Sequence, residues 1–315
     1  MKLTTQLLIA ALLLLAPIAS ARAQARVEKN VIYGMYSGLA LLMDVHRPEK
    51  PNGYGVIFVA GSGWQMPLGY GYDVPALKER QIQVWGPPLL RAGYSVFTVN
   101  HRAAPRFHYP AALEDVQRAV RAVRHHAETY GVGGARMGGI GGSSGAHLVG
   151  LVAMLGAGGV ADDPDPVNQE PATLQAVILR AGPTDLRTRR GEGEVNIVSF
   201  MDLPPPHLRA LKPGLESLKA YTAASPIAHV SHGAPPVLLI HGDADEVVPF
   251  EQSVAMEAAL RAVDVPTKLV RIPGGGHGQD FGEAGKSNPA WPDYFAEMVR
   301  WLDQNLKTQA TTPTK

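Results

Sequence analysis

A turn of five small residues restricts the possible folds of this chain more tightly than any other segment. The turn, Gly141–Gly145 (Gly-Gly-Ser-Ser-Gly), lies between a predicted strand over Met137–Ile140 and a predicted helix over Ala146–Leu155. A strand that enters a helix through so few residues must turn sharply, so the neighbouring side chains must be small. The turn leaves the Ser143 hydroxyl at the helix N-terminus, which favours developing negative charge. The pattern predicts a serine nucleophile on an α/β fold; the alternative is a glycine-rich turn that happens to hold a serine.

Short β-type runs alternate with amphipathic helices along most of the chain. The helical spacing of apolar residues predicts helices over Ala111–Tyr130 and around Phe295–Leu306. The predicted strands are Asn30–Tyr36, Ala40–Val45, Gly55–Val59, Ser95–Asn100, Met137–Ile140, Leu174–Leu179, Val237–Ile240 and Thr267–Ile272. This alternation predicts the α/β class, with a mainly parallel sheet and helices on both faces. The first two strands are expected to form an antiparallel start joined at Ser37-Gly38.

Two long connections interrupt the alternation of strands and helices. One is the glycine- and tyrosine-bearing stretch Gly61–Trp85, and the other is the polar, proline-bearing stretch Arg187–Ser225. Long connections in compact domains are often functional, and both follow strands whose carboxyl ends face the ligand side of an open α/β sheet. We therefore expect them to wall a substrate site, with residues 187–225 forming a small cap.

The first two dozen residues have the pattern of an export signal. Lys2 precedes the apolar run Leu7–Leu15, and the small residues Ala21-Arg22-Ala23 fit a signal-peptidase site. The apolar run is about half a membrane span, which favours a cleaved signal over an uncleaved anchor. We expect a signal peptide over 1–23, one folded domain over 24–308, a polar tail over 309–315, and export to the periplasm or out of the cell.

The composition excludes several classes of protein. The 315 residues are 45% hydrophobic, which is enough for a sizeable core. The absence of cysteine excludes a disulfide framework, a thiolate metal site and a cysteine nucleophile. The net charge of +1 gives no electrostatic preference for nucleic acid or a membrane surface, so neither is expected as a partner. Asp162–Asp165 lacks the spacing of a calcium loop, so no metal is expected there.

Candidate partners for Ser143 follow two later strands. A serine hydroxyl needs a histidine to take its proton, and the histidine needs a carboxylate to orient it. Asp243 and Asp245 lie in the loop after the predicted strand Val237–Ile240, and His277 lies in a glycine-rich loop after the last predicted strand. The chain order of serine, acid and histidine is the order expected for a strand–turn–helix serine nucleophile.

Taken together, these segments resemble the α/β-hydrolases of the carboxylesterase and hormone-sensitive-lipase-like group, nearest the secreted acetyl-xylan- or feruloyl-esterase-like enzymes. Residues 100–105 (Asn-His-Arg-Ala-Ala-Pro) and 109–115 (Tyr-Pro-Ala-Ala-Leu-Glu-Asp) are similar to the Y-R-L-A-P…F-P-A-A-L-E-D segment of that group. Residues 241–249 resemble its H-G-x-x-D-x-x-V-P segment, and the match runs from about Val56 to the last helix. The resemblance implies an α/β-hydrolase fold and a triad of Ser143, Asp245 and His277. Asp243 is the rival acid, or else a turn-former.

The loop after the strand Gly55–Val59 departs from the pattern of the group. The group usually has H-G-G-G and an aromatic residue there, whereas this chain has Ala60-Gly61-Ser62-Gly63-Trp64. Oxyanion donors are backbone N–H groups, so the resemblance implies that Ser62, Gly63 and Ser144 supply them. Loss of the leading histidine removes a side chain that supports this loop in the group. Trp64 is expected to wall the acyl pocket.

The resemblance implies an exported serine hydrolase that cleaves carboxylic esters through an acyl-enzyme and needs no cofactor or metal. His277 would deprotonate Ser143, and Asp245 would orient the imidazole. The implied substrate is a short acyl ester, either a small molecule or an acetyl or feruloyl group on a polysaccharide. Two alternatives stay open: a peptidase of the prolyl-oligopeptidase type, and a non-catalytic binding protein on a decayed hydrolase scaffold.

Overall fold

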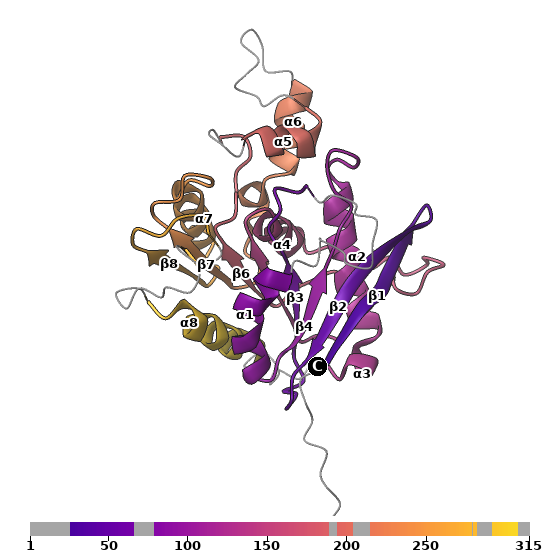
Figure 1. Cartoon of the computed structure of the whole chain (residues 1–315). Coiled ribbons are helices and arrows are strands. Elements are labelled where there is room, and N and C mark those ends of the chain that lie inside the picture. Colours follow the sequence, from indigo (N-terminus) through magenta and orange to yellow (C-terminus); the bar gives the residue numbers. More distant parts are fainter. Residues whose placement is uncertain are drawn as a thin grey trace, which may run out of the picture.

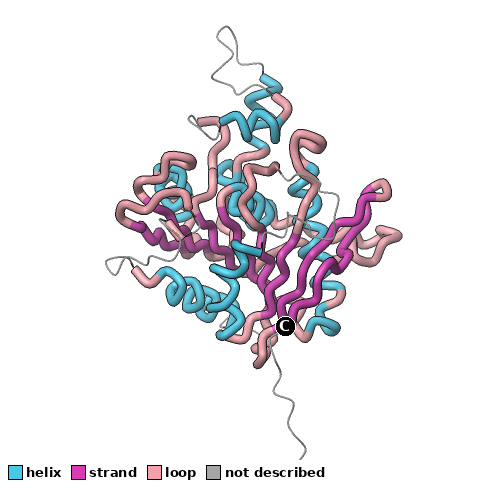
Figure 2. Tube along the Cα trace, in the orientation of Figure 1, coloured by secondary structure: helices cyan, strands magenta, loops and turns pink. Residues whose placement is uncertain are grey.

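The computed structural model describes residues 26–65, 79–188, 194–203, 215–278, 280–281 and 292–307 of the chain. Its centre is an eight-stranded sheet (Figure 1), and Figure 2 shows the strands as one layer flanked by helices. The strands are β1 (Arg26–Tyr36), β2 (Leu39–Arg47), β3 (Gly55–Val59), β4 (Ser95–Val99), β5 (Met137–Gly142), β6 (Ala176–Arg180), β7 (Val237–Gly242) and β8 (Thr267–Ile272). The α-helices are α1 (Glu79–Arg91), α2 (Ala111–His125), α3 (Ala127–Tyr130), α4 (Ser144–Leu155), α5 (Glu194–Met201), α6 (Leu215–Ala223), α7 (Glu251–Arg261) and α8 (Tyr294–Leu302).

Most strands of the sheet run parallel, as the alternation of strands and helices predicts. β1 and β2 form an antiparallel hairpin around the turn at Ser37-Gly38, and β2 pairs antiparallel with β4. The pairs from β4 onward are parallel, in the order β1-β2-β4-β3-β5-β6-β7-β8. The carboxyl ends of the parallel strands therefore share one edge, where ligands bind in open sheets. The predicted fold class is confirmed.

Helices cover both faces of the sheet because alternate strand residues face opposite layers. In β3, Ile57 joins the buried cluster that contains Val120 of α2 and Leu148 of α4. Val56, its neighbour, joins the other cluster with Met298 of α8. Figure 1 shows α2 and α4 on one side of the strands and α1 and α8 on the other. Full burial of each such side chain contributes about 1.5–3 kcal/mol, so both layers hold the sheet.

The structure corrects the expectation that Gly61–Trp85 is one continuous connection. Helix α1 occupies the last part of that stretch and contains Pro87 and Pro88. Proline lacks a backbone donor and usually ends a helix, so this segment does not appear helical in the sequence. Burial of Trp85 and Leu89 against the sheet outweighs the lost hydrogen bonds.

Two helix boundaries also differ from those expected. The predicted helix Ala111–Tyr130 is divided at His126, whose φ of −98° and ψ of 24° interrupt the helical backbone between α2 and α3. The helix after the serine turn begins at Ser144, two residues earlier than expected, and the strand before the turn extends to Gly142. The serine turn is therefore even shorter than the sequence suggests.

The segment predicted to form a cap contributes two described helices. Figure 1 shows α5 and α6 above the carboxyl edge of the sheet. Residues 189–193 and 204–214 of this segment lie outside the described residues, as do the expected signal peptide over 1–23 and the tail over 309–315. Within the described ranges, no helix is both long and apolar enough to cross a membrane.

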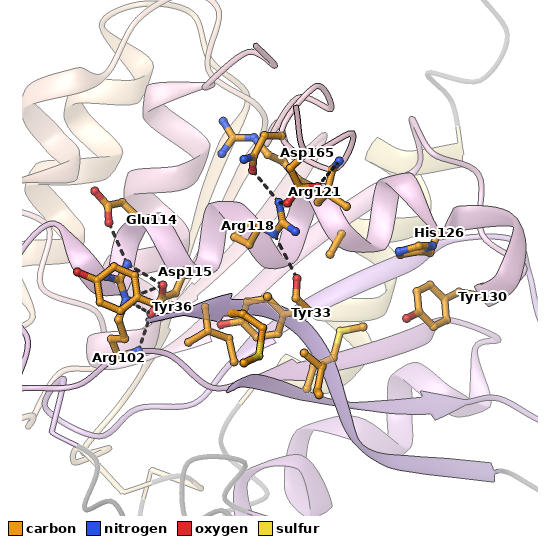
Figure 3. Close-up of a pocket in the computed structure, with 18 residues that line it drawn as sticks. Tyr33, Tyr36, Arg102, Glu114, Asp115, Arg118, Arg121, His126, Tyr130 and Asp165 are labelled. Atoms are coloured by element: carbon orange, nitrogen blue, oxygen red, sulfur yellow. Dashed lines mark hydrogen bonds and ion pairs between the residues drawn. The ribbon is translucent and has the colours of Figure 1, made fainter. Parts of the chain in front are cut away.

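The segment 100–115, which carries part of the resemblance, has a structural role. Arg102 Nε donates to both carboxylate oxygens of Asp115, at 2.9 and 3.0 Å, and the guanidinium lies 4.0 Å from the centre of the Tyr36 ring. Figure 3 shows this buried pair beside a groove of about 630 Å³ between β1 and α2. The groove shares no lining residue with the pocket that contains Ser143. Arg102 and Asp115 thus fix the loop after β4 onto α2.

Candidate active site

Ser143 stands at the sharp turn between β5 and α4. Its φ of 52° lies in the left-handed backbone region, which residues with a side chain rarely adopt. The turn is possible because its flanking glycines lack Cβ atoms. A Cβ on Gly145 would lie 2.0 Å from the Val59 carbonyl oxygen, and one on Gly141 would lie 2.3 Å from the Gly145 backbone. The Ser143 N–H donates to the Arg180 carbonyl oxygen at 2.8 Å, which ties the turn to β6.

The structure brings Ser143, His277 and Asp245 together in one hydrogen-bonded chain. Ser143 Oγ lies 2.9 Å from His277 Nε2, and His277 Nδ1 lies 2.7 Å from Asp245 Oδ2. An ionised carboxylate only accepts hydrogen bonds, so Nδ1 carries the ring proton and Nε2 accepts from the serine hydroxyl. This arrangement allows the imidazole to take the Ser143 proton as the oxygen attacks an electrophile.

The Asp245 carboxylate is buried and bonded at both oxygens. Oδ1 accepts from the backbone N–H groups of Val247 and Val248, at 2.9 and 2.8 Å. Oδ2 accepts from His277 and, at 3.2 Å, from His241 Nε2. Burial alone would raise the pKa of Asp245, but the hydrogen bonds from His241 and His277 outweigh it and hold the pKa well below its ordinary value. The carboxylate therefore stays charged while it orients the imidazole.

His241 is a site residue that the sequence reasoning missed. Its ring is fully buried, and Nε2 faces two acceptors, Asp245 Oδ2 and the Val248 carbonyl oxygen at 2.9 Å. Nε2 is therefore assigned as the protonated nitrogen, and Nδ1 accepts from the Ser253 hydroxyl at 2.7 Å. The available signal was the H-G-x-x-D-x-x-V-P segment, in which His241 precedes Asp245 by four residues.

The rival acid, Asp243, is bonded elsewhere. One of its oxygens pairs with Arg271 Nε at 2.6 Å, and the other accepts from the Gly274 backbone N–H at 2.6 Å. These contacts join the loop after β7 to strand β8 and to the loop that follows it. The carboxylate presented to His277 is that of Asp245.

Ser143 and His277 border a pocket of about 320 Å³. Its walls come from the loops after β3, β7 and β8, from the ends of β5 and β6, and from helices α1 and α5, which contribute Gln81 and Asn196. Trp64 borders the pocket, but its side chain is only 1% exposed and stacks on Phe200 with 4.7 Å between ring centres. The Trp64 ring therefore mainly supports the loop that carries it.

The three expected oxyanion donors differ in their bonding. The Ser62 N–H already donates to Ser144 Oγ at 2.8 Å, so it is not a vacant donor. Ser144 is the first residue of α4, and its N–H has no acceptor within the helix. Among the described groups, no acceptor is paired with the Gly63 N–H. Of the three, Gly63 and Ser144 therefore keep a backbone N–H without an acceptor in the described part of the chain.

Gln81 of α1 holds the loop of residues 60–64, which is named the oxyanion loop after the expected donors in it. This role of Gln81 was also missed by the sequence reasoning. Its Oε1 accepts from the Gly61 N–H at 2.9 Å, and its Nε2 donates to the Gly61 carbonyl oxygen at 2.8 Å. A Cβ on Gly61 would lie 2.6 Å from the Gly142 carbonyl oxygen, so the loop and the serine turn are in close contact. The side chain of Gln81 thus supports the loop that has Ala60 in place of a histidine.

Metal-ligating side chains do not cluster in the described part of the chain. There, no group of three or more histidines, aspartates and glutamates could hold a metal ion. Within the Asp162–Asp165 stretch, Asp165 pairs with Arg118 at 2.8 Å and accepts from the Val167 N–H. These bonds order a surface loop. Among the described residues, the triad is the group whose arrangement has a clear chemical capacity.

The chain is similar to known proteins over most of its length. The profile of the BD-FAE family matches residues 43–260. Esterase LipQ of Mycobacterium tuberculosis is 32% identical over 265 residues, which cover 82% of this chain and 59% of LipQ. The acylamino-acid-releasing enzyme of Rattus norvegicus is 28% identical over 232 residues, which cover 69% of this chain and 28% of that enzyme. The chain thus spans about three fifths or less of the length of these relatives.

A solved structure with a similar fold is a truncated form of a carbohydrate esterase from gut microbiota. It superimposes with a TM-score of 0.71 at 24% identity, and the match covers 91% of this chain and 99% of that chain. At this identity the likeness shows the fold alone. It agrees with the sheet order and the helix layers described above, so the chain has the α/β-hydrolase fold.

Proposed function

We propose that this chain, which belongs to the BD-FAE family, is a serine hydrolase that cleaves carboxylic esters through a covalent acyl-enzyme. The observation that carries the proposal is the continuous hydrogen-bonded chain from Ser143 through His277 to Asp245. Such an arrangement activates a serine hydroxyl, whereas a binding protein gains nothing from it. The similarity to an esterase, LipQ, supports the same class of reaction.

In the proposed mechanism, each triad residue has one task. His277 Nε2 takes the proton of Ser143 Oγ as this oxygen attacks the ester carbonyl carbon, and Asp245 stabilises the imidazolium that forms. The N–H groups of Gly63 and Ser144 stabilise the negative charge on the carbonyl oxygen. His277 then gives its proton to the leaving alcohol. Water attacks the acyl-enzyme with His277 as base, which releases the acid and regenerates Ser143.

The proposed substrate is a short acyl ester, carried by a small molecule or by a polysaccharide. The pocket beside Ser143 is about 320 Å³, and helix α5 adds the polar side chain of Asn196 to its wall. The similar structure from gut microbiota is a carbohydrate esterase by name. An acetyl or feruloyl group on a polysaccharide is the proposed form of this ester.

The proposal includes export to the periplasm or out of the cell. Its support is the sequence pattern of residues 1–23, in which a basic residue, an apolar run and small residues follow one another. Protein recovered outside the cytoplasm with Gln24 as its first residue would support export. Cytoplasmic protein that keeps Met1 would contradict it.

The expected activity is hydrolysis of 4-nitrophenyl acetate without cleavage of the corresponding anilide. Release of 4-nitrophenol by the protein from Gln24 onward is expected with a kcat/KM of about 10⁴ M⁻¹ s⁻¹ or more, the lower end of typical enzymes. Acetate release from acetylated xylan, measured in parallel, tests the polysaccharide-linked class.

Other outcomes of this assay favour the alternatives. Clear cleavage of an alanyl or prolyl 4-nitroanilide, with slow ester hydrolysis, would favour a peptidase, to which the likeness to the acylamino-acid-releasing enzyme also points. Background rates on all substrates would favour a binding protein on a hydrolase scaffold.

The two hydrogen bonds between Gln81 and Gly61 give a second expected result. Gln81→Ala removes both hydrogen bonds to Gly61 and lets the oxyanion loop move, while the triad stays in place. We expect kcat to fall by about 10²-fold, the cost of misplacing a catalytic group by roughly 1 Å, with little change in KM. Gln81→Glu keeps an acceptor for the Gly61 N–H but turns a second acceptor oxygen toward the Gly61 carbonyl oxygen, so it should also lose activity. Equal KM and kcat for Gln81→Ala and the parent would contradict a positioning role.

A further inference from the structure

Arg180 places a buried positive charge at the edge of the pocket that contains Ser143. It is the last residue of β6, and its backbone carbonyl accepts from the Ser143 N–H at 2.8 Å. The residue is only 5% exposed, yet it borders the same pocket as Ser143 and His277. Arg180 therefore lies at the edge of the pocket that contains the proposed nucleophile.

Among the described residues, the Arg180 guanidinium has few partners. Nη2 donates to the His277 carbonyl oxygen at 2.7 Å, and the Phe281 ring centre lies 4.6 Å from the central carbon. Nε is buried and has no hydrogen-bond partner in the described part of the chain. Asp245, Tyr294 and Asp280 act on Arg180 through space, and no hydrogen bond from Arg180 to any of these three described residues is present. Burial lowers the pKa of Arg180 to about 10, so the group is charged at neutral pH.

Arg102 is a buried arginine with a structural role, and its ion pairs can be compared with the contacts of Arg180. The residue is 7% exposed, and its guanidinium forms ion pairs with Asp115 at 2.8 Å and Glu114 at 2.9 Å. Burying a charge is costly unless it is paired, and Arg102 is paired within the protein. Arg180 is as deeply buried, forms no such ion pair with any described residue, and borders a pocket. Its countercharge is therefore expected from the molecule that enters the pocket.

We propose that Arg180 binds a carboxylate carried by the ester substrate. This inference rests on the proposed function, because it assigns a substrate class to the same pocket. A guanidinium offers a planar set of donors that matches a carboxylate, and such charge-assisted bonds are strong and directional. The contacts to His277 and Phe281 hold the group before a substrate arrives, so little ordering is needed on binding. The carboxylate belongs either to the acyl part, as in a dicarboxylic hemiester, or to the alcohol part, as in a uronic acid.

Two pairs of substrates test the inference and separate these two sources. The pair 4-nitrophenyl hemisuccinate and its methyl ester tests the acyl part, by release of 4-nitrophenol. The pair acetylated glucuronic acid and acetylated glucose tests the alcohol part, by release of acetate. We expect the parent protein to prefer the charged member of one pair by about 10- to 100-fold in kcat/KM, the effect of one hydrogen bond between charged groups.

Variants at position 180 assign the preference to this side chain. Arg180→Gln should abolish the preference for the charged ester, and Arg180→Lys should keep part of it because the charge remains. Arg261→Gln is the matched control, since it removes the same charge from an arginine of α7 that pairs with Glu257 outside the pocket. Its preference should equal that of the parent. Thermal unfolding is recorded for each variant, and Arg180→Lys carries the test if Arg180→Gln does not fold.

The neutral esters distinguish failure of this inference from failure of the proposed function. If the neutral esters are hydrolysed and neither charged ester is preferred, the inference is overturned and the proposed function stands. If no ester is hydrolysed, calorimetry with succinate and glucuronate on Ser143→Ala replaces the kinetic test. Binding that is lost when Arg180→Gln is added supports the carboxylate site, and absence of binding overturns it.

Discussion

Ser143→Ala is expected to lower kcat/KM for 4-nitrophenyl acetate by roughly 10⁵- to 10⁶-fold, as loss of the nucleophile does in serine hydrolases. The substitution removes the oxygen that forms the acyl-enzyme and leaves His277 Nε2 without the hydroxyl that lies 2.9 Å away. The pocket and the oxyanion donors remain, so the residual rate should reflect binding and electrostatic stabilisation alone. Initial rates of 4-nitrophenol release, corrected for the uncatalysed reaction, measure the loss.

The control for this variant is another serine-to-alanine change. Ser231 is exposed and lies outside the pocket, so Ser231→Ala should keep the parental rate. Both variants should unfold at temperatures close to that of the parent, because the Ser143 N–H still donates to the Arg180 carbonyl oxygen in Ser143→Ala. A loss of less than tenfold for Ser143→Ala would mean that another group or water attacks the ester.

Asp245→Asn is expected to lower kcat by about 10⁴-fold, the loss that follows when the histidine of a triad is held in the wrong tautomer. The Asp245 carboxylate accepts from His277 Nδ1 at 2.7 Å and so keeps Nε2 free to accept the Ser143 proton. An asparagine can place its NH₂ group there, which requires Nδ1 to accept and moves the ring proton to Nε2. The imidazole then cannot act as the base. Steady-state kinetics on the same aryl ester measure the effect.

Asp243→Asn is the matched control for that result, because the two acids lie in the same loop and the change of charge is identical. Asp243 bonds to Arg271 and to the Gly274 N–H, and neither contact reaches His277. We expect Asp243→Asn to keep the parental kcat. The reverse outcome, with Asp243→Asn inactive and Asp245→Asn active, would move the acid of the triad to position 243.

The sheet and the serine turn could be predicted from the sequence because each depends on local patterns. The strands Gly55–Val59 and Thr267–Ile272 have the bounds predicted for them, since apolar runs between turn residues are strong local signals. The turn at Ser143 requires glycine on both sides, and the close approaches at Gly141 and Gly145 show the physical reason. The family resemblance then supplied the pairing of His277 with Asp245 over Asp243.

The rest of the site depends on contacts between distant segments, which no local pattern reveals. Gln81 lies on α1, a helix that the sequence does not indicate because the helix contains two prolines. The partner of Gln81, Gly61, is twenty residues away in the sequence. The bond from the Ser62 N–H to Ser144 Oγ joins residues 82 positions apart and changes which donors are available for an oxyanion. The sequence indicates only that Arg180 ends a buried strand. The fold places its guanidinium against the His277 carbonyl oxygen, and the residue at the edge of the pocket that contains Ser143.

The central claim is that Ser143 is the nucleophile, and covalent labelling tests it most directly. The protein is incubated with a 4-nitrophenyl alkylphosphonate, which reacts with activated serines, and the peptide that carries residue 143 is analysed by mass spectrometry. We predict one adduct per chain, located on Ser143, which forms in step with the loss of esterase activity and is absent from Ser143→Ala. An unlabelled chain, or an adduct on another residue such as Ser144 that persists in Ser143→Ala, would contradict the account.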